Sequence, residues 1–108
     1  MDAKDIDRLI EQDVNITRVL ERSLTEEQAK TFKMKTMDAR MTYFELTAKP
    51  WARWFSKAFL VRSGLVKPDQ SVGIVEIAYA GFREETRQVR LEFYKEIKKV
   101  YMEITNEL

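Results

Sequence analysis

The residue types that most enzymes use for acid–base and nucleophilic chemistry are scarce in this sequence. It contains no histidine and no cysteine, which removes histidine-based triads, thiolate nucleophiles and the usual zinc sites. Two pairs of glutamates four residues apart, Glu92/Glu96 and Glu103/Glu107, could share a metal ion on one helix face. Helical di-metal sites of this type also use Glu-x-x-His motifs, which a chain without histidine lacks. We therefore expect no enzyme activity, no cofactor and no metal site.

The sequence also lacks support for two motifs that bind nucleotides or DNA. The glycines at 64, 73 and 81 are too far apart for a phosphate-binding or dinucleotide-binding loop. A helix-turn-helix with Gly81 as its turn glycine would place Arg87 where a core aliphatic residue belongs, so this motif is unsupported.

The most distinctive segment, residues 50–67, interleaves aromatic and basic side chains and contains no acid. Such a segment can hold a nucleic-acid backbone, lie on a membrane surface or anchor a protein interface. Aromatic residues at helical spacing can instead fill a core. We expect Trp54 to be a core residue and Trp51, which follows Pro50, to be partly exposed.

Basic residues are concentrated in the middle of the chain. Residues 1–28 carry eight acids and four bases, residues 29–68 two acids and nine bases, and residues 69–108 eight acids and six bases. The middle can form a basic binding face, or the acidic first helix can pack beside it and neutralise it. The candidate nucleic-acid-binding residues are Lys30, Lys33, Lys35, Arg53, Lys57 and Trp51.

The strongest helix signal covers residues 82–106, where apolar residues recur at spacings of three and four. Bases flank one side of this apolar seam and glutamates the other, as at the flanks of coiled coils. A helix over residues 69–106 would be ~55 Å long and would protrude from a domain of this size, so its seam would need a partner. We expect a homo-oligomer, with a dimer favoured. The candidate interface residues are Phe82, Val89, Phe93, Ile97, Val100, Ile104, Arg87 and Arg90.

Apolar spacing also predicts a first helix over residues 4–22. A capping box at Thr25 and Gln28 begins a second helix. This helix should end at Ala48 or Lys49, because the residue before a proline disfavours helical geometry. Its expected apolar stripe consists of Ala29, Phe32, Met37, Met41, Phe44 and Ala48.

Pro50 suits the first turn of a third helix, Pro50–Ser63, with Gly64 as its C-cap. Residues 71–80 are rich in strand-forming residues, but a lone strand would leave its backbone groups unpaired. A helix is therefore favoured there, and the alternative is a short strand that pairs with its copy in a dimer.

These observations predict an all-α fold in one domain, residues 1–108: a small bundle of four to five helices with a long C-terminal helix. We find no internal repeat. No apolar run reaches the ~20 residues of a membrane span, and the acidic start differs from a signal peptide, so a cytoplasmic protein is expected. The expected function is nucleic-acid binding by an oligomer through the basic and aromatic middle. The alternative is a protein-interaction or structural-assembly subunit that docks a protein partner through the Trp-rich helix 50–63.

Overall fold

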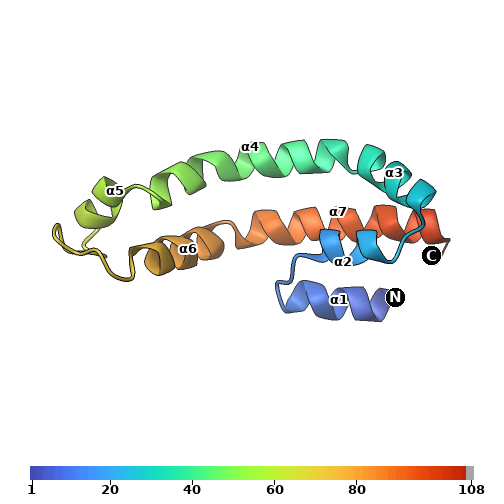
Figure 1. Cartoon of the computed structure of the whole chain (residues 1–108), viewed down its shortest axis with the longest axis horizontal. Coiled ribbons are helices and arrows are strands. Elements are labelled where there is room, and N and C mark those ends of the chain that lie inside the picture. Colours follow the sequence, from blue (N-terminus) through green and yellow to red (C-terminus); the bar gives the residue numbers. More distant parts are fainter. Residues whose placement is uncertain (107–108) are drawn as a thin grey trace. The chain divides into compact units, whose positions relative to one another are not determined.

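The computed structural model describes residues 1–106, which form seven helices (Figure 1). They are α1 (Ala3–Glu11), α2 (Ile16–Arg22), α3 (Glu26–Lys35), α4 (Met37–Trp54), α5 (Lys57–Arg62), α6 (Ile74–Glu85) and α7 (Arg87–Thr105). No strand occurs within residues 1–106, so the all-α prediction is confirmed over this range. Most of the segment 71–80 is the start of α6. The helices are more numerous and shorter than expected, and the breaks between them have local causes.

The chain packs as two compact units, which are described separately. Unit 1 consists of residues 1–43 and the segment from Arg90 onward, and unit 2 is Phe44–Val89. Helices α4 and α7 therefore contribute residues to both units. The assignment of residues 1–108 to one domain stays a prediction.

The helix expected over residues 4–22 is divided into α1 and α2 by a turn at Asp13. Asp13 adopts a positive φ of 57°, a left-handed conformation that a helix cannot accommodate and that Asp tolerates better than most residues. Asn15 then caps α2 by accepting a hydrogen bond from the Thr17 N–H. At the start of α1, the Asp2 carboxylate accepts the Asp5 N–H, and this backbone hydrogen bond lowers the pKa of Asp2.

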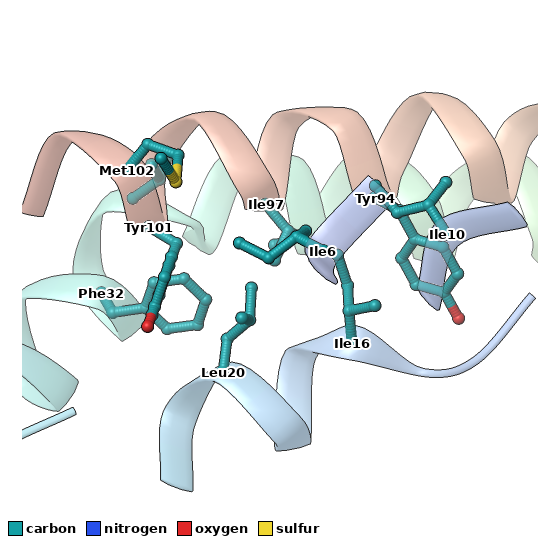
Figure 2. Packing of buried hydrophobic residues seen from close by; sticks show 10 residues of the cluster. Ile6, Ile10, Ile16, Leu20, Phe32, Tyr94, Ile97, Tyr101 and Met102 are labelled. Atoms are coloured by element: carbon teal, nitrogen blue, oxygen red, sulfur yellow. The ribbon is translucent and has the colours of Figure 1, made fainter. Parts of the chain in front are cut away.

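The core of unit 1 is formed by side chains from α1, α2, α3 and α7 (Figure 2). The apolar face of the first two helices survives the break between them, because Ile6, Ile16 and Leu20 are all completely buried. α7 covers them with residues that include Ile97 and Tyr101, and the Tyr101 hydroxyl lies 2.9 Å from the Ser23 hydroxyl. Burial of each such aliphatic side chain contributes about 1.5–3 kcal/mol, so this cluster is the main stabilising feature of the unit.

Two buried threonines mark helix junctions that the sequence analysis missed. Thr36 lies between α3 and α4, and Thr86 lies between α6 and α7. The hydroxyl of each donates a hydrogen bond of 2.7 Å to the carbonyl four residues earlier, that of Phe32 or Phe82. A hydroxyl bonded in this way favours bending or interrupting a helix. The helix expected from Thr25 and the one expected over 82–106 are both interrupted there.

The two junctions share a spacing, Phe-x3-Thr-x3-Arg, at Phe32–Thr36–Arg40 and at Phe82–Thr86–Arg90. In the first, the Arg40 Nε donates to the Thr36 hydroxyl at 3.1 Å, and the Arg40 Nη2 donates to Glu21 at 2.7 Å.

The expectation that the second helix ends at Ala48 or Lys49 is wrong. α4 continues through Pro50 to Trp54, and Pro50 is not the first residue of a third helix. A proline inside a helix loses one backbone hydrogen bond and disfavours helical geometry before it, but flanking turns can hold the helix together. The next helix, α5, is short and begins only at Lys57, where the Ser56 hydroxyl accepts the Phe59 N–H. Gly64 follows α5 with a positive φ of 73°, as expected of a residue that ends a helix.

Unit 2 has a smaller core in which Leu60, Val66 and Ala78 are buried. Trp54 packs against this core and lies directly over Gly81 of α6. A Cβ atom added at Gly81 would come within 2.2 Å of the Trp54 ring. Gly81 therefore permits the close contact between the end of α4 and α6, and a side chain there would separate them.

Candidate interaction surface

The six predicted nucleic-acid-binding residues are divided equally between the two units. Lys30, Lys33 and Lys35 are exposed on α3 in unit 1, whereas the other three belong to unit 2. At about 100° per residue, Lys30 and Lys33 share a side of α3, but Lys35 lies roughly 140° away from Lys30. Within the part of the chain that is described, α3 thus brings together two of these residues.

Arg53 has an acidic partner. It forms an ion pair with Glu85 of α6, and its guanidinium lies 5.7 Å from the centre of the Phe59 ring. The Trp54 Nε1 donates a hydrogen bond of 3.2 Å to the same glutamate. Arg53 and Trp54 therefore help to hold α4 against α6, and the charge of Arg53 is partly compensated. Lys57 is exposed at the start of α5.

Trp51 is exposed, as predicted, whereas Trp54, which was expected to be a core residue, is only partly buried. Trp54 is half-buried against the core of unit 2, whereas the Trp51 side chain is 56% exposed. The Trp51 ring stacks on Phe55, with centroids 5.1 Å apart, and Phe55 makes an edge contact of 6.3 Å with Phe82 of α6. We call Trp51, Phe55 and Phe82 the aromatic surface. Ring contacts at these distances are favourable, so the surface is held in place before any partner binds.

Aromatic and basic side chains are separated on α4. The backbone N–H of Phe55 still bonds to the carbonyl of Trp51 at 3.0 Å, so helical spacing applies to both residues. Trp51 and Phe55 then lie about 40° apart around the helix, whereas Lys49 and Arg53 lie roughly 160° from Trp51. The interleaved pattern seen in the sequence therefore becomes two opposite faces, one aromatic and one basic.

The predicted oligomer seam is largely occupied within the chain. Ile97 and Val100 are core residues of unit 1, with exposed fractions of 0% and 5%. Phe93 is partly buried and stacks on Tyr43, with ring centroids 4.8 Å apart. Ile104 also packs against this core, and Phe82 and Val89 are partly buried in unit 2. Arg87 is exposed, and Arg90 binds Asp13 within unit 1. Neither Ile97 nor Val100 is accessible to a second copy while this core is intact.

The apolar stripe expected on the second helix is mostly exposed. Met37, Met41 and Phe44 were grouped with Phe32 in one stripe, yet only Phe32 is buried. Phe44 is 75% exposed. The angle around the helix axis could have distinguished the exposed residues from Phe32, because on one continuous helix Phe32 would lie roughly 140° from Met37.

Two hollows in unit 1 are open to solvent and do not resemble active sites. One, of about 430 Å³, is lined by Asp7, Lys95, Lys98, Lys99 and Met102. Lys98 already binds Asp7 there at 2.6 Å. The other hollow, of about 360 Å³, is lined by residues of α3 and by Ile104. Among residues 1–106, no group of three or more metal-ligating side chains is close enough to hold an ion.

Comparison with known proteins finds no matching family model, no matching curated protein and no matching solved structure. None of the helices in residues 1–106 combines the length and apolar character needed to cross a membrane.

Proposed function

We propose that this chain is a non-enzymatic protein-interaction module that docks a protein partner through the aromatic surface. The observation that carries the proposal is the exposure of Trp51 beside Phe55 and Phe82. Tryptophan is among the residues most enriched at the energetic centres of protein interfaces. A stacked tryptophan presents a large apolar area with little side-chain freedom left to lose on binding.

The same geometry gives less support to nucleic-acid binding. Binding of single strands combines stacking platforms with cations that follow the backbone, so both must face the ligand. On α4, Lys49 and Arg53 point away from Trp51, and Arg53 is already bound to Glu85. The formal net charge of +1 adds little long-range attraction for a polyanion. We therefore place the protein partner first and treat nucleic acid as an outcome of the test.

The test is affinity purification from the native host with the full chain as bait, after nuclease treatment. Three baits are compared: the unmodified chain, Trp51→Ala, and Leu65→Ala as a control at another exposed apolar residue of unit 2. We expect a protein that the unmodified chain and Leu65→Ala retain and Trp51→Ala loses. Loss of all bound material on nuclease treatment, or equal capture by all three baits, would overturn the proposal.

A further inference from the structure

Helix α4 carries an apolar row that the chain leaves in solvent. Its members are Met37, Met41, Phe44, Ala48 and Trp51, and all five are exposed. Their spacing of four, three, four and three is that of a heptad seam. At about 100° per residue they lie within an arc of roughly 80°, and Phe55 continues the row one turn beyond Trp51.

The exposure of this row is unusual for a helix of this length. α4 has 18 residues, and Thr47 is its single fully buried residue. The row includes four large side chains with exposed fractions above one half: Met37 at 55%, Met41 at 56%, Phe44 at 75% and Trp51 at 56%. Scattered exposed apolar residues are ordinary, but a continuous row at seam spacing is typical of an interaction surface.

Charged residues flank the row in a complementary order. With Met37, Phe44 and Trp51 at d positions, Asp38 and Glu45 occupy e positions on one side of the row. Arg40 occupies a g position on the other side. The two flanks of α4 therefore carry opposite charges, and Arg40 is followed five residues later by Glu45.

We propose that a second copy of this chain docks along the α4 row in parallel orientation. In parallel pairing, a g residue faces the e residue five positions later on the other helix. This places Arg40 of each copy opposite Glu45 of the other copy. Antiparallel pairing would instead bring the acidic e positions of the two helices together. The proposal rests on the proposed function, because it names the protein partner of a surface that includes Trp51.

Arg40 can take part without giving up its existing contacts. Its side chain is 33% exposed, and it binds Glu21 through Nη2 and the Thr36 hydroxyl through Nε. A guanidinium has five N–H donors, so one group can bind carboxylates of two chains. Docking along the α4 row would leave the core of each unit intact, since all five residues of the row are exposed.

Sedimentation of the full chain tests association through this row. We expect a monomer–dimer equilibrium between about 1 and 200 µM. Phe44→Glu should raise the dimer dissociation constant by at least about tenfold, since two carboxylates would meet at one d position. Leu46→Glu is the matched control, because Leu46 is 55% exposed on the same helix but points away from the row. A monomer at all concentrations, or a dimer that Phe44→Glu leaves intact, would overturn the proposal.

Disulfide trapping tests the orientation, and it is clean because the chain has no cysteine of its own. Parallel pairing brings Ala48 close to Ala48 of the second copy, so Ala48→Cys should form a cross-linked dimer under mild oxidation. Leu46→Cys should form none. In antiparallel pairing, Ala48 would face Phe44 or Trp51 instead. A dimer whose Ala48→Cys variant forms no cross-link would therefore overturn the parallel arrangement.

These experiments separate the inference from the proposed function. A chain that is monomeric, yet captures a host protein that Trp51→Ala loses, overturns self-association and leaves the proposed function standing. A chain that dimerises as expected and captures only its own copy from the host, which Trp51→Ala loses, supports the second copy as the partner.

Discussion

Arg90 and Asp13, which are 77 positions apart in the sequence, form a two-point ion pair within unit 1. The Arg90 Nε donates to one carboxylate oxygen of Asp13 at 2.5 Å, and the Nη2 donates to the other at 2.6 Å. The Arg90 side chain is nearly buried, and that of Asp13 is about one-fifth exposed. This pair gives a reason for the left-handed turn at Asp13, which ends α1 and lets the carboxylate meet α7.

Removing one partner of this pair should be strongly destabilising. Asp13→Ala removes the carboxylate that accepts from both Nε and Nη2 of the nearly buried Arg90, and the expected loss in the free energy of unfolding is about 3–5 kcal/mol. Urea denaturation of the variant and the unmodified chain measures this loss. The control is Asp7→Ala, whose exposed carboxylate binds Lys98, and we expect it to cost no more than about 1 kcal/mol. Equal losses in the free energy of unfolding for Asp13→Ala and Asp7→Ala would contradict a strongly stabilising role of the Arg90–Asp13 pair.

A charged residue at Val100 should unfold the monomer rather than separate two copies. Val100 is buried in the cluster that α1, α2, α3 and α7 form, so an aspartate there would place a charge in the core of unit 1. Circular dichroism at low micromolar concentration should show loss of helix for Val100→Asp. If Val100→Asp is instead a folded monomer with unchanged helix content, the apolar seam of α7 becomes a candidate interface again.

Gly81→Ala should destabilise the chain although alanine is the better helix former. In an exposed helix this change stabilises by about 0.5–1 kcal/mol. Here the new Cβ would overlap the Trp54 ring, so we expect a loss of about 1–3 kcal/mol. Thermal denaturation followed by tryptophan fluorescence measures both the stability and the environment of Trp54. Ala80→Ser, at the exposed neighbouring position, should have little effect. A stabilised Gly81→Ala variant would show that the contact is not close.

Binding to nucleic acid should be weak. We expect no binding to duplex DNA or RNA at ~50 mM salt with tens of micromolar protein, because Arg53 is already paired with Glu85 and the formal net charge is only +1. Fluorescence anisotropy is the measurement. If binding is found, a plot of the logarithm of the association constant against the logarithm of the salt concentration should have a slope of about −0.9 for each phosphate contacted. A slope of roughly −3 to −5 that Lys33→Ala reduces by about one unit would instead support the basic middle segment as the binding surface.

Features that depend on neighbouring residues were predictable from the sequence. The capping box of Thr25 and Gln28 begins α3, and both of its hydrogen bonds are present. Gly64 ends α5, and the apolar spacing of residues 82–106 identified helical segments correctly. Trp51 was expected to be more exposed than Trp54 because it lies beside Pro50. Caps, turn residues and helical periodicity act over a few residues, so sequence spacing contains this information.

Helix breaks within strong helical patterns were harder to foresee. Thr36 and Thr86 are ordinary residues in a helical pattern, and each interrupts its helix where its hydroxyl is buried and bonded to the preceding turn. Pro50, the strongest local stop signal, did not end α4. Local preferences of these residues amount to a few kcal/mol at most, and packing of the surrounding helices can outweigh them.

The choice between core and surface was made by the tertiary structure. The sequence by itself determined that α4 and α7 are helices with apolar faces, but periodicity does not state which partner covers a face. Ile97 and Val100 meet side chains of α1, α2 and α3, which are far from them in sequence, and so become core. Met41 and Phe44 carry an equally regular pattern and remain exposed. Burial is a property of two surfaces in contact, and the second surface is supplied only when distant segments fold together.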